Sequence, residues 1–124
     1  MTQTIRAFLL VEAASFAVAA LVHFGVLIQG YEHQQAGTAE SAIAVVLLLG
    51  LALSWTTLAS TRAVGLAAQA LALLGTLIGV FTIAVGVGPR TGPDIAYHIA
   101  IVAVLVAGLI VAARARVAES MQRA

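Results

Sequence analysis

Long apolar runs alternate with short polar breaks along the whole chain. Each run has about 20 residues or more, which is the length that a helix needs to cross a hydrocarbon core of roughly 30 Å. The breaks between them are short and consist of turn-forming residues. The pattern therefore predicts an all-α protein, with four transmembrane helices in an up-down-up-down bundle. The predicted spans are residues 5–28, 38–60, 63–87 and 93–113.

Composition places this bundle in lipid. Hydrophobic residues make up 62% of the 124 residues and charged residues 9%, against roughly 45–50% and 25% in a soluble domain. We therefore expect a single domain over residues 1–124, with the lipid bilayer as its main partner. The net charge is +1 and the arginines are scattered, which argues against a nucleic-acid partner. The chain contains no cysteine, so it has no disulfide and no thiolate metal site.

The first apolar run resembles a signal peptide because Arg6 precedes it. The run is nevertheless about 24 residues long, longer than the 7–15 residues of a signal core. It also carries Glu12 and ends without a small-x-small cleavage pattern. We therefore expect it to be retained as the first transmembrane helix.

The arginines predict the orientation in the membrane. Five of them would lie on one side of the bundle, and only Arg90 on the other. The positive-inside rule then places both termini in the cytoplasm and the segments 29–37 and 88–92 outside. We expect a multi-pass protein of a bacterial inner (cytoplasmic) membrane. The five arginines on the cytoplasmic side are Arg6, Arg62, Arg114, Arg116 and Arg123.

Small residues at spacings of three and four predict close helix packing in lipid. The third run carries the longest such seam: Gly65, Ala68, Ala72, Gly75, Gly79, Thr82 and Gly86. The fourth run carries a shorter one: Ala96, Ala100, Ala103 and Ala107. This second seam lies roughly 160–200° away from the face of Asp94 and His98. If both faces are covered, a homo-oligomer would cover one of them.

Polar side chains inside the runs fall into two layers. Glu12 and His23 share one face of the first helix, because their spacing places them within roughly 20° of each other. His23 lies five residues before the outer end of its run, and His98 about five residues after the outer start of the last run. We therefore expect an outer layer that holds both histidines and an inner layer in which Glu12, Ser54, Trp55 and Gln69 share a depth. The candidate ligand-binding residues are Glu12, His23, Glu40, Trp55, Gln69, Asp94, Tyr97 and His98.

Most of these residues also have a structural explanation. Asp94 follows Thr91 by three positions, as in a helix-capping pair, and Glu40 lies near a helix start. Glu12 is harder to explain, because a carboxylate at that depth without an arginine partner is either protonated or functional. The structural alternatives for the others are interfacial aromatics for Tyr97 and Trp55 and an interhelical hydrogen bond for Gln69.

Two short stretches resemble known families. The length of the chain and the histidine in "AALVHFG" resemble the small four-helix bacterial membrane proteins of the DoxX-like kind. The stretch "LLVEAASF", with its glutamate, is similar to the first helix of small multidrug-resistance transporters, in which a glutamate binds drug and proton. The aromatic Tyr/Trp–Ser–Gly motif of those transporters is absent from the third run, "LALLGTLIGVFTIAVG". Neither resemblance assigns a catalytic residue.

The leading functional hypothesis is a small membrane binding protein with a histidine and carboxylate site near the outer face. Its ligand would be a haem, a metal or a small apolar molecule. His23 and His98 could serve as axial ligands of a b-type haem or, with a carboxylate, bind a divalent metal. The alternatives are a proton-coupled small-molecule transporter that uses Glu12 and a structural or assembly subunit without a ligand. Enzymatic activity has the least support, because no nucleophile stands beside a histidine in a recognisable motif.

Overall fold

A computed structural model describes the backbone of residues 1–123 and the side chains of residues 1–115. Within these residues the chain is all-helical and contains no strand. Every helix is long and apolar enough to cross a membrane. The predicted all-α class with four apolar helices is confirmed, and the structure is compatible with a multi-pass membrane protein. The helices are α1 (Thr2–His23), α2 (Gln34–Leu53), α3 (Thr61–Ala84) and α4 (Gly92–Arg123).

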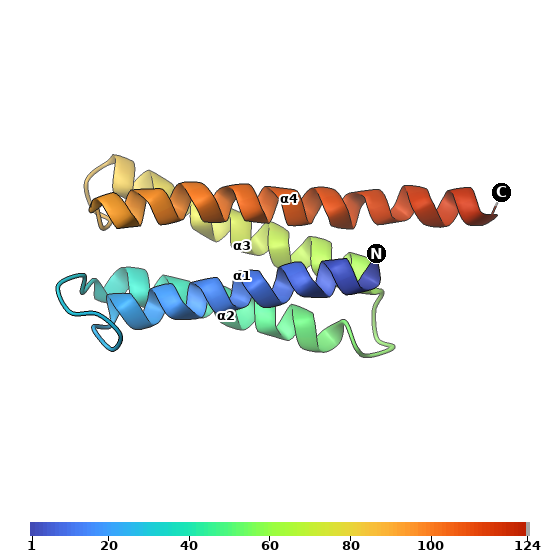
Figure 1. Ribbon diagram of the computed structural model, residues 1–124, viewed down its shortest axis with the longest axis horizontal. Helices are drawn as coiled ribbons and strands as arrows, with labels where there is room; N and C mark the ends of the chain where they lie inside the picture. The colour runs from blue at the N-terminus through green and yellow to red at the C-terminus, as the bar shows by residue number, and fades with distance from the viewer. Residues whose placement is uncertain (124) are drawn as a thin grey trace.

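The four helices pack side by side along one long axis (Figure 1). Each helix contacts the next one along the chain, and α1 also contacts α3 and α4. The α1–α2 and α3–α4 connections lie at the same end of the bundle, on the left in Figure 1. The N-terminus and the α2–α3 connection lie at the other end. We call the first of these the histidine end, because it carries residues 24–33 and 85–91 and the three histidines nearby.

Three predicted spans extend too far at their C-terminal ends. α1 ends at His23 rather than at residue 28, because Gly25 adopts a left-handed φ of 72°. The N–H of Gly25 bonds to the carbonyl of Val22, and the N–H of Val26 to that of Leu21, which is a Schellman motif. Gly86, with φ 84°, ends α3 in the same way. The prediction that His23 lies five residues inside its helix was therefore wrong, since His23 is the last residue of α1.

The second helix is shifted relative to its predicted span of residues 38–60. α2 begins at Gln34, where the imidazole Nδ1 of His33 caps it by accepting a hydrogen bond from the N–H of Ala36, at 3.2 Å. It ends at Leu53. An N-cap imidazole is less common than the Ser, Thr, Asp or Asn that usually signals a helix start, which explains why the sequence pattern placed this start too late.

The apolar core is a thin stripe along the bundle axis. Leu9, Phe16, Leu47 and Leu105 are almost fully buried, whereas many other leucines, valines and isoleucines are exposed on the outer surface, as lipid contact requires. Small residues bring the helices close, since a Cβ on Gly65 would lie 2.5 Å from Ile5. The N-terminal half of the predicted α3 seam is confirmed by the burial of Gly65, Ala68 and Ala72.

The alanine seam predicted on α4 faces outward. Ala96, Ala100, Ala103 and Ala107 are all exposed, while Ile101, Leu105 and Gly108 face the bundle interior. The polar face of this helix is therefore the one that packs inside. The homo-oligomer inferred from the seam stays a prediction.

Candidate functional site

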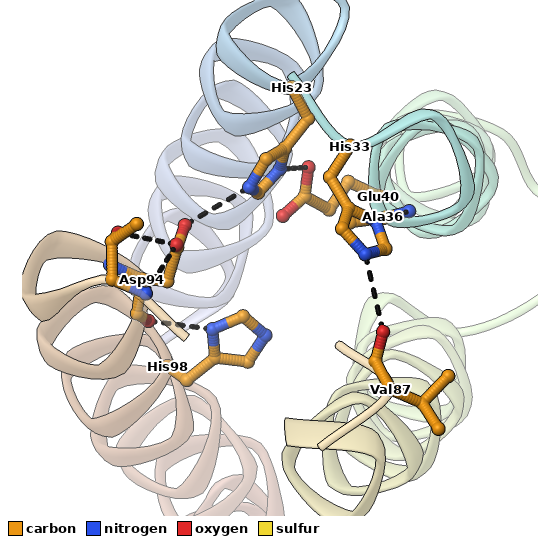
Figure 2. Close-up of polar contacts among 8 residues, drawn as sticks. His23, His33, Ala36, Glu40, Val87, Asp94 and His98 are labelled. Atoms are coloured by element: carbon orange, nitrogen blue, oxygen red, sulfur yellow. Dashed lines mark hydrogen bonds and ion pairs between the residues drawn. The ribbon is translucent and has the colours of Figure 1, made fainter. Parts of the chain in front are cut away.

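Three buried side chains from three helices meet at the histidine end of the bundle. Nδ1 of His23 lies 2.7 Å from Oε2 of Glu40, and Nε2 of His23 lies 3.1 Å from Oδ1 of Asp94. Figure 2 shows the imidazole of α1 between the carboxylates of α2 and α4. We call these three residues the polar cluster. It joins α1, α2 and α4 at one level of the bundle.

Local backbone structure fixes the position of His23. It occupies the last position of α1, where the Schellman motif around Gly25 turns the chain. Its carbonyl accepts a hydrogen bond of 2.8 Å from the N–H of His33, the residue that caps α2. The end of α1 and the start of α2 are therefore tied together directly beside the cluster.

Asp94 belongs to the cluster and to a helix cap at the same time. Its Oδ2 accepts hydrogen bonds from the N–H of Thr91, at 3.1 Å, and from the Thr91 hydroxyl. Its own N–H donates to Thr91 Oγ1 at 3.3 Å, which completes a reciprocal capping box. The capping explanation and the site explanation of Asp94 are thus compatible, since each uses a different carboxylate oxygen.

His98 lies one turn further along α4. Its Nδ1 lies 2.8 Å from the backbone carbonyl of Asp94, and a carbonyl can only accept, so Nδ1 carries the proton. In the neutral imidazole, Nε2 then carries a lone pair. The structure therefore brings His23 and His98 together through Asp94, one through its side chain and the other through its backbone.

The two contacts of His23 restrict the protonation states of the polar cluster. As an imidazolium, His23 donates from both nitrogens to two carboxylates; as a neutral imidazole, it donates once and accepts once from a protonated carboxyl. Both arrangements give a net charge of −1, and one further proton on a carboxyl gives a neutral cluster, because the carbonyl oxygen of a protonated carboxyl still accepts a hydrogen bond. A buried group of this kind is stabilised by a further proton or by a nearby cation.

A groove runs between α1 and α4 on the side of the polar cluster. Its volume is about 670 Å³. Its walls are almost entirely apolar and include Val11, Val18 and Val22 of α1. At the histidine end the lining also contains polar side chains. The residues there are His23, Tyr31, Pro93, Asp94 and Tyr97.

A smaller cavity lies on the other side of the cluster, among α2, α3 and α4. Its volume is about 160 Å³. Glu40 and His98 contribute to its lining, together with Thr76 and Thr82 of α3. The polar cluster therefore separates two spaces, with Asp94 facing the groove and Glu40 facing the cavity.

The inner layer of candidate residues forms a separate pair. Glu12 and Gln69 are both fully buried, and Nε2 of Gln69 donates to Oε1 of Glu12 at 3.3 Å. Among the described side chains, Oε2 of Glu12 and Oε1 of Gln69 have no hydrogen-bond partner. Gly108 of α4 closes over this pair, because a Cβ at Gly108 would lie 2.7 Å from Oε1 of Glu12. Neither the groove nor the cavity is lined by Glu12 or Gln69.

The two remaining candidates are aromatic and lie apart from each other. Trp55 is 62% exposed at the opposite end of the bundle, where the guanidinium of Arg6 lies 5.1 Å from its ring centre. It therefore does not join Glu12 and Gln69. Tyr97 packs edge-on against Phe16 and against His98, with ring centres 6.1 Å and 5.6 Å apart.

One polar contact of this bundle was missed by sequence reasoning. Arg6 donates through Nε to the Ser54 hydroxyl at 3.1 Å and through its terminal nitrogen to the Ser54 carbonyl. Thr61 also donates to that carbonyl, at 3.1 Å. The signal was available, because a tight connection between the first two helices brings the start of one beside the end of the other. The contact closes the end of α2 and lies far from the polar cluster.

A haem or metal centre finds little support in this geometry. Both ring nitrogens of His23 are occupied by carboxylates, which leaves no lone pair for a metal. Within residues 1–115, no group of three histidine, cysteine or acidic side chains is arranged to hold a metal ion. Only His98 retains a nitrogen that is free to act as a ligand.

Comparisons with known proteins add no relative. No protein-family model, no curated protein and no solved structure matches the chain. Functional inference therefore rests on the chemistry of the residues described above.

Proposed function

We propose that this protein is a small binding protein of the bacterial cytoplasmic membrane that takes up a lipophilic cation from the bilayer. The observation that carries this proposal is the groove between α1 and α4, which has apolar walls and a negatively charged polar cluster at one end. Its volume of about 670 Å³ falls within the roughly 300–1,000 Å³ of small-molecule sites. A ligand with a large apolar surface would replace lipid along the walls.

The charge around the groove favours a positive ligand. With both hydrogen bonds formed and no further proton bound, the polar cluster carries one uncompensated negative charge. Arg90 lies beside Gly86 at the end of α3 and does not line the groove. Opposite charges in a partly buried site attract far more strongly than in water.

The carrier alternative based on Glu12 has less support. Glu12 bonds to Gln69 beneath Gly108, and neither the groove nor the cavity reaches it. Proton coupling through Glu12 would need a path that this arrangement does not provide. We therefore base the proposed site on the groove and the polar cluster.

The test compares two probes that share size and shape but differ in charge: tetraphenylphosphonium and tetraphenylborate. Binding is measured by calorimetry with the full chain in lipid nanodiscs, after subtraction of binding to empty nanodiscs. We expect saturable binding of the cation at least tenfold tighter than that of the anion. Equal affinity for both ions would contradict the charge argument.

Matched variants locate the binding. Ala14→Phe fills the groove, which Ala14 lines, whereas Ala42→Phe adds the same ring to an exposed position of α2 outside the groove. We expect the first variant to lose phosphonium binding and the second to keep it. Equal binding by the two variants would show that the ligand does not occupy the groove.

A further inference from the structure

One buried carboxylate oxygen at the cavity among α2, α3 and α4 accepts no hydrogen bond. Glu40 is 4% exposed, and its Oε2 contacts His23. Its other oxygen, Oε1, is buried and has no hydrogen-bond partner among the described residues. In Figure 2 this second oxygen points into the space between the helices, on the side where the His98 ring lies. Glu40 and His98 both line the cavity.

His98 presents a second acceptor to the same space. Its Nδ1–H is used on the carbonyl of Asp94, which leaves the lone pair on Nε2. This nitrogen lies toward Gly79, where an added Cβ would be 3.4 Å away from it. The glycine thus leaves room in front of the lone pair.

The other polar groups of the cavity wall also offer acceptors. The hydroxyl of Thr76 donates to the carbonyl of Ala72 at 2.7 Å, and that of Thr82 donates to the carbonyl of Gly79 at 2.7 Å. Since each hydroxyl has a single proton, both oxygens retain only lone pairs for a further partner. Gln35, the lining residue with free amide donors, is exposed at the rim.

From this arrangement we infer that the cavity binds a small nitrogen cation with several N–H donors, such as ammonium or methylammonium, between Glu40 and His98. The bound cation would donate one hydrogen bond to Oε1 of Glu40 and another to Nε2 of His98, with the threonine oxygens as further acceptors. It would also neutralise the net negative charge of the polar cluster. A volume of about 160 Å³ accommodates such an ion with water but not a lipophilic cation.

The donor set distinguishes ammonium from an alkali ion of similar size. Potassium is a hard cation that prefers several oxygen ligands and gains little from an imidazole nitrogen. Ammonium makes directional hydrogen bonds, for which an imidazole lone pair is a good acceptor. The site is spatially separate from the groove, because Glu40 and His98 do not line the groove and Ala14 does not line the cavity, although both sites face the same charged polar cluster.

The experiment titrates the full chain in nanodiscs with ammonium chloride or potassium chloride at constant ionic strength. Binding is followed by calorimetry and by the ¹⁵N resonance of His98 Nε2. We expect one saturable ammonium site, a shift of that resonance with ammonium, and at least tenfold weaker binding of potassium. Equal responses to both salts, or no response to either because the cavity holds water alone, would overturn the inference.

Variants assign the site to its two acceptors. Glu40→Gln and His98→Phe should each weaken ammonium binding at least tenfold, whereas Glu32→Gln changes an exposed carboxylate at the same end and should leave it unchanged. His98→Phe keeps the bulk of the ring and leaves the polar cluster intact, so it remains informative if Glu40→Gln fails to fold. Full binding by His98→Phe would contradict the assignment. Ala14→Phe should keep ammonium binding, which separates this result from the outcome for the groove.

Discussion

The imidazole of His23 lies 3.1 Å from the carboxylate of Asp94, although 71 positions separate them in the sequence. This contact links the first helix to the last at the histidine end, where His23 and Asp94 both line the groove. Because the same imidazole also contacts Glu40, the position of α4 at this end depends on a residue of α1 that is already fixed to α2. The cluster therefore determines both the charge and the spacing of α1 and α4 at this end of the groove.

Removing the imidazole of His23 should lower the free energy of unfolding. His23→Leu leaves two buried carboxylates without their shared partner, and losing one member of a buried ion pair costs about 3–5 kcal/mol. The free energy of unfolding can be measured by circular dichroism in mixed detergent and dodecyl sulfate micelles. Glu32→Gln, at an exposed carboxylate of the same end, should change it by less than about 0.5 kcal/mol.

The loss of unfolding free energy caused by His23→Leu should also depend on the carboxylate of Glu40. In a double-mutant cycle, His23→Leu and Glu40→Gln should couple by about 0.5–3 kcal/mol, because both changes remove the same contact. Additive effects would mean that the contact of 2.7 Å between them contributes nothing to stability.

Glu12→Gln should preserve the inner pair. A glutamine at this position can accept from Nε2 of Gln69 and also donate to Oε1 of Gln69, which has no partner among residues 1–115. We expect a change in unfolding free energy below about 1 kcal/mol, whereas Glu12→Leu leaves the Gln69 amide unpaired and should cost about 1–3 kcal/mol. A larger loss for Glu12→Gln than for Glu12→Leu would show that a charged carboxylate is required.

Two glycines of α4 offer a matched test of packing above that pair. An alanine at Gly108 would place its Cβ against Glu12 and Gln69, and overpacking of this kind costs about 1–3 kcal/mol. A Cβ added at Gly92 would have no heavy atom within 4 Å. Gly92→Ala should therefore be neutral or stabilise the protein by up to about 1 kcal/mol. Both variants can be compared in the same micelle unfolding assay. Equal effects would argue against the close contact of α1, α3 and α4 at this level.

The orientation predicted from the arginines can be tested by labelling. Gln35→Cys lies at the start of α2, and Thr57→Cys lies in the α2–α3 connection at the opposite end of the bundle. In intact cells, a membrane-impermeant maleimide should label the first variant and not the second. Labelling of Thr57→Cys alone would reverse the orientation and place the groove entrance on the cytoplasmic side.

The sequence predicted the helices better than their ends. Four uninterrupted apolar runs can form little else in lipid, because every backbone group must be satisfied internally. The ends depend on the backbone conformation of single residues, such as the positive φ at Gly25 and Gly86, and apolar residues that follow these glycines extend the pattern beyond the helix.

The site was predicted in part, and the limit was helix rotation. Counting depth placed His23 near His98 and Glu12 near Gln69; in the structure Glu12 bonds to Gln69, whereas His23 contacts Asp94, one turn before His98 on α4. Depth alone also placed Trp55 beside Gln69, yet Trp55 lies on the outer surface against Arg6. Which face of a helix turns inward depends on the packing of all four helices together, and no single run contains that information.

The double use of the Asp94 carboxylate has a mechanical consequence. Its two oxygens belong to one rigid plane, and one of them contacts His23 while the other accepts from Thr91. Any movement of the imidazole that rotates this plane also loosens the cap of α4. Ligand binding in the groove or the cavity should therefore change the hydrogen exchange of the Thr91 backbone N–H. Thr91 is exposed to solvent, so a probe at the first turn of α4 can report whether a ligand is bound.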